Sequence, residues 1–503
     1  SETGGGICLV NDSYLYANRV TLYGNTAGIE GGGLYSDASS LYMKNSILWE
    51  NSPDQIVDNS TRLFLVTYSD IMGGYSGTGN IDIDPLFVNA DNGNLRLSWE
   101  NYPVHDGTMS PCIDSGDPDS GIESDGSIVD MGGLHFNQYG TYYYPDVASG
   151  TWTAAESPYL LENDVTVDSL STLVIESGAS VFATGLYKLE IKGRLLAEGT
   201  TREQIRFGAV YPETGWIGLQ FIETNDNGLE GSVLNNCHFQ HGNWEDDGLD
   251  QFGGAILCNE ASDLTISNCI FENNTGYGGG AIFLAYSDVS LENILIDNCI
   301  SDCEGGGIAI YFCDPQLNNV NVQNCYANDP GGGIYLMRSN AVLQDVVIDN
   351  NEAIWYGGGI YCYSLSNPSL TNVTVSNNLT QAEYGGGIYC DTYSIPAVME
   401  SLTVIGNTSY NKGGGIFLDG TDSISLQNST INDNFAYYGG GIYAHYADFL
   451  TLSDCTVSGN SAYFHGGGFY YFNTSGSQLL STDILDNTAN NSGGGIMATS
   501  SSI

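Results

Sequence analysis

A glycine-rich element recurs along the chain and limits the folds that the chain can adopt. The element is Gly-Gly-Gly/Ala followed by an apolar and an aromatic residue, and from Gly253 onward its copies lie 26 to 28 residues apart. A repeat of this length without the spacing of amphipathic helices indicates that each unit is one coil of short β-strands. The copies begin at Gly4, Gly31, Gly253, Gly279, Gly305, Gly331, Gly357, Gly385, Gly413, Gly439, Gly466 and Gly493.

The strand after the glycines alternates with a period of two. In the coil of Gly357, Ile360 and Cys362 fall on one face of the strand and Tyr361 on the other. We therefore predict an inward apolar row and an outward aromatic column, stacked at about 4.8 Å per coil. Such a column can dock sugar rings or pack against a neighbouring rod. Alternatively, it only stabilises the sheet through cross-strand pairs. The column consists of Tyr335, Tyr361, Tyr389, Phe417, Tyr443 and Tyr470.

Asparagine recurs after the second strand run of each coil. Asn tolerates left-handed backbone conformations, and its side chain can hydrogen-bond to the Asn of the next coil. We therefore expect a ladder formed by Asn298, Asn324, Asn350, Asn377, Asn407, Asn434, Asn460 and Asn487.

These motifs resemble those of the right-handed parallel β-helix superfamily, whose shape was first associated with pectate lyases. More narrowly, the GGGIY units are similar to those of bacterial surface β-helix repeat proteins, including polymorphic outer-membrane proteins. The resemblance covers residues 216–503 and 1–60. It implies an all-β fold, a right-handed parallel β-helix with 26–28 residues per coil, interrupted by a small β closing module.

Two segments interrupt the glycine period. The first, 61–139, contains Asp84-Pro-Leu-Phe and Ser110-Pro-Cys-Ile-Asp, and it resembles the closing module that follows β-helices in secreted bacterial proteins. The second, 140–215, resembles the opening coils of a new β-helix. We therefore expect terminal coils of a first helix in 1–60, an acidic closing module in 61–139, opening coils in 140–215 and the repeat helix in 216–503.

The charge of the chain excludes several partners. Lys and Arg total 11 against 59 Asp and Glu, which gives a formal net charge of −48. Such a chain lacks the cations that bind nucleic-acid phosphates or an anionic membrane surface. It also has no apolar run of about 20 residues, so we predict no membrane insertion.

The scarcity of cations also bears on catalysis. An enzyme acting on uronate polymers needs Lys or Arg to neutralise substrate carboxylates. After Arg206 the chain has only Arg338 and Lys412, three coils apart, and we place both on turns or loops. We therefore predict that the chain is not an enzyme and carries no catalytic residues.

An acidic loop and six cysteines are the remaining candidate sites. Oxygen-rich loops with glycine suit Ca²⁺, so either a structural Ca²⁺ or solvated turn residues are expected at Asp114, Asp117, Asp119, Asp125 and Asp130. No other cofactor is expected. The cysteines fall in pairs on adjacent coils, Cys237 with Cys269, Cys299 with Cys325, and Cys362 with Cys390. Each pair is within disulfide range or forms a ladder of thiols packed as small apolar groups.

These observations predict an extracellular or cell-surface structural protein. The chain begins and ends part-way through a coil, and bare solenoid ends expose unpaired strand edges. We expect such ends to self-associate head to tail into a surface fibre, unless the chain is a fragment of a larger protein. The alternative is a carbohydrate-binding adhesin stalk with glycans as partners. A polysaccharide lyase or hydrolase is the third hypothesis.

Overall fold

The protein, described by a computed structural model, is built almost wholly of β-strands. The structure describes residues 2–90, 94–99, 105, 107–121, 127–134, 136, 141–143, 146–154, 157–224, 229–243 and 252–503. Over these residues no α-helix is present. The chain forms two compact units, Ser1–Gly140 and Thr141–Ile503. The predicted all-β fold of stacked parallel coils is confirmed.

The first unit contains three short parallel sheets of three strands each. Successive coils supply one strand to every sheet, so that residues about 25 positions apart become register partners, as in Leu15 and Leu41. Its small core includes Leu34, Leu41 and Met43. The sheets are β1 (Ile7–Leu9), β4 (Leu34–Ser36) and β7 (Ile56–Asp58); β2 (Tyr14–Asn18), β5 (Ser40–Lys44) and β8 (Phe64–Thr67); and β3 (Thr21–Tyr23), β6 (Ile47–Trp49) and β9 (Asp70–Ile71).

A segment that is not part of the β-helical coils follows them in the first unit. It contains an antiparallel pair, β10 (Phe87–Asn89) and β11 (Asn94–Leu97), and a 3-10 turn, η2 (Pro118–Ser120). Trp99, Cys112 and Met131 of this segment pack with Ile47 of β6 in a separate apolar cluster. The segment therefore covers an apolar side of the coils.

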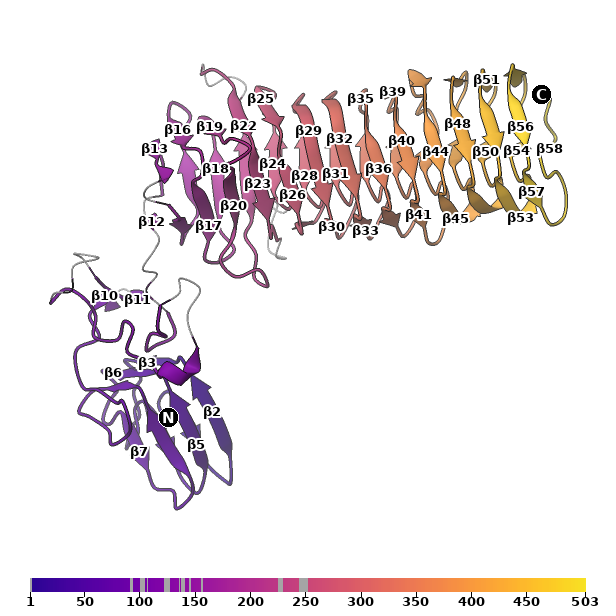
Figure 1. The fold of residues 1–503 in the computed structure, drawn as a ribbon. Helices are drawn as coiled ribbons and strands as arrows, with labels where there is room; N and C mark the ends of the chain where they lie inside the picture. Colours follow the sequence, from indigo (N-terminus) through magenta and orange to yellow (C-terminus); the bar gives the residue numbers. More distant parts are fainter. Residues whose placement is uncertain are drawn as a thin grey trace. The chain divides into compact units, whose positions relative to one another are not determined.

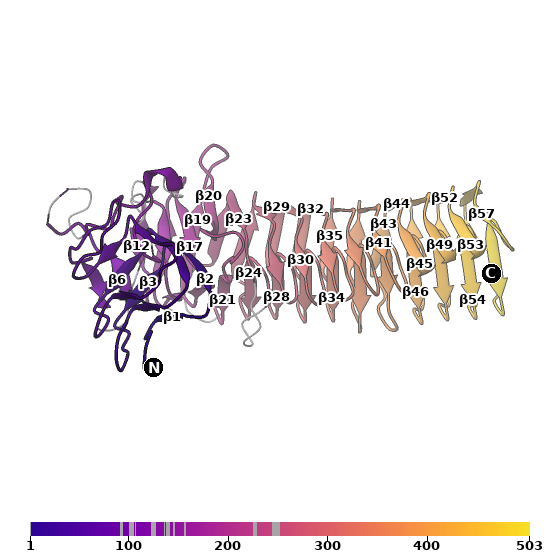
Figure 2. The same cartoon turned by 90° about the horizontal axis from the view of Figure 1, so that it is seen from below.

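The second unit is a solenoid with three parallel sheets that run along its length. Figures 1 and 2 show its strands stacked in sequence order, from magenta to yellow. One sheet has 25 strands, from β12 (Thr141–Tyr143) to β56 (Asp483–Leu485), and another has nine, from β27 (Thr275–Gly276) to β57 (Thr488–Ala489). The strands that follow the glycines form the third, which we call the 13-stranded sheet.

The 13-stranded sheet positions the candidate site. Its strands are β15 (Val165–Val167), β18 (Lys188–Ile191), β21 (Gly218–Ile222), β24 (Ile256–Asn259), β28 (Ile282–Ala285), β31 (Ile308–Tyr311), β34 (Ile334–Met337), β38 (Ile360–Tyr363), β42 (Ile388–Cys390), β46 (Ile416–Asp419), β50 (Ile442–His445), β54 (Phe469–Phe472) and β58 (Ile496–Thr499). Ile360 pairs with Ile388, and Ile388 with Ile416. These isoleucines are fully buried in the main core, as the alternation predicts.

The glycine triplet is required by the coil stacking. The first glycine of a triplet, such as Gly385, has a φ of 71°, a left-handed conformation that glycine adopts without a steric cost. A Cβ on the second glycine, Gly386, would lie 2.5 Å from the carbonyl oxygens of Gly414 and Thr408. Only glycine therefore lets successive coils approach at the spacing of a parallel sheet.

The asparagines form two ladders rather than the single predicted column. Asn350 and Asn377 have φ values near 55° and lie on the exposed corner of the coil. One position later, Asn378 and Asn407 are fully buried, and the amide of each donates to the Oδ1 of the next. The predicted column followed the corner up to Asn377 and the buried position from Asn407 onward, because the later corners are occupied by Gly406, Asp433, Gly459 and Asp486.

Candidate functional site

The outer face of the 13-stranded sheet, which is turned away from the core, carries three parallel rows of side chains. The middle row is the aromatic column Tyr335, Tyr361, Tyr389, Phe417, Tyr443 and Tyr470. The first row lies just before the glycines, beside the 13-stranded sheet, and its last three members end strands of the nine-stranded sheet. It comprises Tyr356, Tyr384, Lys412, Tyr438 and His465. The third row lies at the strand ends and comprises Tyr363, Asp391, Asp419, His445 and Phe472.

The middle row lies on the outer face, but its rings are covered. Tyr361 is 6% exposed and Tyr389 is 5% exposed, because the first and third rows flank them. Their rings stack on each other, with centroids 4.9 Å apart and an interplanar angle of 16°. Burial raises the pKa of both phenols. Since the ring faces are occupied by neighbouring coils, a ligand on this surface meets the flanking rows first.

The third row brings two carboxylates and an imidazole together. Asp419 and His445 are register partners, and His445 Nδ1 donates to Asp419 Oδ1 at 2.6 Å. The Tyr389 hydroxyl donates to the other carboxylate oxygen, Oδ2, at 3.4 Å. Asp391 directly follows Cys390, whose partner is Leu418, so it stands beside Asp419 on the preceding coil. Burial, and then the charge of Asp419, raise the pKa of Asp391.

Lys412 supplies a cation to the same face. It ends β45 (Thr408–Lys412), and its Nζ lies 4.9 Å from the ring centroid of Tyr384 and 5.4 Å from that of Tyr443. Burial lowers the pKa of Lys412, while the charges of Asp419 and Glu383 raise it. Such an ammonium group, held over aromatic faces, can interact with an electron-rich ligand.

Exposed aromatic side chains belong to the third row or follow its residues closely in sequence. Tyr363 is 37% exposed, Tyr393 68% and Tyr446 55%. The Tyr446 ring packs edge-on against His445, with centroids 4.6 Å apart. Tyr446 has a φ of 49°, an unusual conformation for a bulky residue. The imidazole of the third row is therefore in contact with a ring that solvent reaches.

A groove of about 420 Å³ opens on the same face over the first coils of the solenoid. Asn259 and Ala285, small residues at the positions that correspond to the third row in earlier coils, leave this space open. Phe252 and Phe283 supply its apolar walls. Glu190 lines it too and forms ion pairs with Lys188 at 3.2 Å and Lys192 at 2.6 Å. The outer face thus has polar groups at two places, with the aromatic cluster between them.

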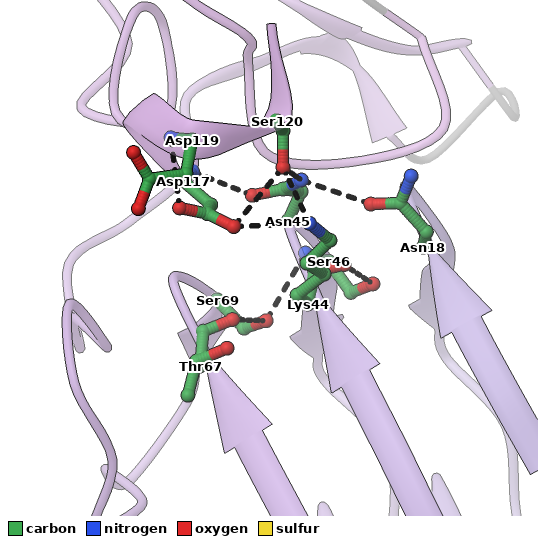
Figure 3. Close-up of polar contacts among 9 residues, drawn as sticks. All are labelled: Asn18, Lys44, Asn45, Ser46, Thr67, Ser69, Asp117, Asp119 and Ser120. Atoms are coloured by element: carbon green, nitrogen blue, oxygen red, sulfur yellow. Dashed lines mark hydrogen bonds and ion pairs between the residues drawn. The ribbon is translucent and has the colours of Figure 1, made fainter.

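The acidic loop of the first unit uses several of its carboxylates within the protein. Asp117 caps η2 and accepts from Lys44 Nζ at 2.9 Å, and its own N–H donates to Asn45 (Figure 3). Asp130 accepts the N–H groups of Asp114 and Phe136. Asp119 is exposed, and Asp125 lies outside the described residues. A Ca²⁺ ion at this loop stays a prediction.

The six cysteines of the predicted pairs all lie in the main core. Cys362 and Cys390 are direct register partners. The other two pairs also lie on adjacent coils, because Cys237 and Cys269 precede the partners His238 and Ile270, and Cys299 and Cys325 precede the partners Ile300 and Tyr326. Whether any pair is oxidised in the native protein stays a prediction.

The comparisons with known proteins agree with the fold. Residues 218–352 and 341–503 match the family model described as right handed beta helix region, so the chain belongs to this family. No curated protein matches the chain in sequence. Among the described residues, no helix has the length and apolar character needed to cross a membrane.

Three solved structures illustrate the shared fold. The periplasmic alginate epimerase AlgG is 13% identical, with 70% of this chain and 79% of that chain covered, at a TM-score of 0.33. The Azotobacter vinelandii mannuronan C-5 epimerase AlgE4 A-module is 13% identical, with 70% of this chain and 91% of that chain covered, at a TM-score of 0.26. The Streptococcus pneumoniae surface adhesin PfbA is 12% identical, with 68% of this chain and 84% of that chain covered, at a TM-score of 0.25. At these identities the likeness concerns the fold and not the function.

The prediction that the chain is not an enzyme is contradicted, because the right handed beta helix family, to which the chain belongs, includes lyases and hydrolases. That prediction relied on few cations placed on remote loops. Lys412 instead ends a strand at the outer face, and Asp419 is among the charges that act on it. Scarce cations therefore do not exclude catalysis on this fold.

Sequence reasoning missed Asp391, Asp419 and His445. They are 28 and 26 positions apart and belong to three different coils, so no local motif contains them. Aligning the coils on their glycines would have placed all three in one column.

Proposed function

We propose that the outer face of the 13-stranded sheet binds a carbohydrate chain at the third row. The observation that supports the proposal is the run of hydrogen-bonding groups, Asp391, Asp419 and His445, in a row that also holds the exposed ring of Tyr363. The exposed ring of Tyr446 packs on His445, and exposed Tyr393 follows Asp391 by two residues. Sugar rings present both apolar faces and hydroxyl groups, and sites for such ligands combine aromatic walls with a few placed polar groups.

The spacing of the row suits an extended glycan. Each coil adds one third-row side chain at about 4.8 Å, which is close to the length of one monosaccharide in an extended chain. A glycan lying along the solenoid would therefore meet a similar group at each sugar unit. The net charge of −48 disfavours polyanionic glycans, so the proposed ligand is neutral.

Binding to immobilised polysaccharides tests this proposal. The panel comprises xylan, mannan, galactan and β-glucan as neutral glycans, with alginate and polygalacturonate as acidic ones. Tyr446→Ala and Tyr393→Ala should each weaken binding about 2- to 12-fold, the range for one aromatic contact. Tyr463→Ala is the matched control, since Tyr463 is 52% exposed but belongs to β53 (Ser461–His465) of the nine-stranded sheet.

A neutral glycan whose binding is weakened by Tyr446→Ala and Tyr393→Ala, but not by Tyr463→Ala, would support the proposal. Absence of binding to the whole panel, or equal effects of all three variants, would overturn it. We also propose that the protein acts outside the cell, where such glycans occur. Head-to-tail assembly into a fibre is a separate proposal, which is drawn from the repeated coils. It is compatible with a glycan-binding face.

A further inference from the structure

A lysine and a buried carboxamide meet on the outer face of the first solenoid coils. Gln220 of β21 is 1% exposed, and its Oε1 accepts a hydrogen bond from Lys188 Nζ of β18 at 3.2 Å. The same Nζ lies 3.2 Å from Oε2 of Glu190, and Lys192 Nζ lies 2.6 Å from Oε1 of that carboxylate. The Lys188 amine therefore contacts a carboxamide and a carboxylate at the same time.

The register of the 13-stranded sheet holds these groups in place. Glu190 pairs with Gln220, and Lys188 pairs with Gly218, so the lysine reaches diagonally across two adjacent coils to the amide. Leu257 is the register partner of Gln220 on the following coil and is itself buried. The carboxamide thus stands between a charged cluster and an apolar side chain, on strands rather than on a loop.

Glu190 is placed to accept a proton from Lys188. The Lys188 side chain is 13% exposed, and both burial and the like charge of Lys192 on the same carboxylate disfavour its ammonium form. Burial raises the pKa of Glu190, but hydrogen bonds from Lys192 and Lys188 outweigh burial and hold this pKa below its ordinary value. Glu190 is therefore ionised, as a proton acceptor must be.

The amine is also close to the carbon that it would attack. A C=O bond is about 1.2 Å long, so Lys188 Nζ lies within about 4.4 Å of Gln220 Cδ. Groups held together in this way react with effective molarities of about 10⁵ M or more when they are well oriented. A bond within the chain has to form only once, so even a slow exchange of the amide modifies the protein permanently.

We propose that Lys188 and Gln220 join in an isopeptide bond between adjacent coils. Glu190 takes a proton from Lys188, and Nζ then bonds to Cδ of Gln220. Glu190 passes its proton to Nε2 and takes a second one from Nζ, and the bond from Cδ to Nε2 breaks. Ammonia leaves with the proton that Glu190 then holds, so that the products are one amide bond and one ammonium ion. The bond does not depend on the proposed glycan binding.

The intact mass of the full chain tests this inference. The native chain should weigh one ammonia less than its sequence specifies, and tandem mass spectrometry after proteolysis should find the peptides of Lys188 and Gln220 joined. Lys188→Arg removes the nucleophile and Glu190→Ala removes the proton acceptor, so both should restore the full mass. Lys192→Arg is the matched control: arginine keeps a cation at Glu190, and the ammonia loss should remain.

Two results would overturn the assignment. The first is the full sequence mass in the native chain, even after long incubation in the folded state, and this result does not depend on whether any variant folds. The second is an ammonia loss that persists in Lys188→Arg, because the loss would then come from another site, such as an asparagine that cyclises. Circular dichroism of each variant checks that its strands have formed.

Discussion

The buried asparagine ladder offers a sharp test of what stabilises the solenoid. Asn407 is fully buried, and its Oδ1 accepts the N–H and the Nδ2 of Asn378, both at 2.9 Å. Its own Nδ2 donates to the Val375 carbonyl at 2.8 Å and to Asn434 Oδ1 at 3.0 Å. Asn407→Ala removes all four bonds and leaves four buried partner groups on three residues each short of a bond.

The expected cost follows from these orphaned groups. Each unsatisfied buried group costs about 1–3 kcal/mol, so Asn407→Ala should destabilise its coil by about 4 kcal/mol, at the high end for single substitutions. The control is Asn377→Gly. Asn377 is exposed, has a φ of 54° and bonds only Asp349 among the hydrogen bonds resolved for its side chain, and glycine occupies the equivalent corner at Gly406. The control should cost less than about 1 kcal/mol.

Hydrogen exchange read by mass spectrometry suits a solenoid, whose coils need not unfold together. In Asn407→Ala the amides of the coils around Asn378 and Asn434 should exchange roughly 10³-fold faster. In Asn377→Gly they should change little. If both variants exchange alike, the buried ladder does not carry the stability assigned to it.

Three further predictions concern titration, thiols and assembly. Burial raises the pKa of Asp70 in the first unit to about 6. Because the folded pKa lies above the ordinary value, the contribution of Asp70 to stability is present below about pH 4 and is lost as the pH rises through 6, by up to about 3 kcal/mol. Asp70→Asn should abolish this pH dependence of the unfolding free energy, as measured by urea unfolding. Hydrogen bonding to Cys362, together with burial, raises the pKa of Cys390, so a thiol reagent should label exposed Cys8 in the native protein and these two only after unfolding. Negative-stain electron microscopy should show filaments with an axial repeat of one subunit if coil ends associate, and short separate rods would refute assembly.

The parts of the fold that repeat could be predicted from sequence. The glycine triplets and the alternation of Ile360, Tyr361 and Cys362 specify coils, an inward row and an outward row, because both depend on local backbone geometry. The burial of Tyr361 could not be predicted in the same way. This burial depends on ring contacts of Tyr361 with Tyr356, which precedes the glycines, and with Tyr363, which ends the strand.

The candidate site was harder to predict, because it is defined between coils. Asp391, Asp419 and His445 are each an ordinary polar residue at a strand end, and only the register of the sheet brings them together. Lys412 was misplaced for a related reason, since a residue before the glycines reads as a turn but is paired with Tyr438 in a strand. Register across coils, rather than local composition, determines the chemistry of the outer face.

Carboxyl footprinting in the presence of a bound glycan tests the central claim most directly. A carbodiimide and an amine label accessible carboxyl groups, and mass spectrometry reports the labelled fraction of Asp391 and Asp419. The control is Glu400, which is exposed on β43 (Val398–Glu400) of the 25-stranded sheet. With the neutral polysaccharide that binds most tightly, labelling of Asp391 and Asp419 should fall while that of Glu400 is unchanged. If the glycan binds but leaves the labelling of Asp391 and Asp419 unaltered, the third row is not where carbohydrate is held.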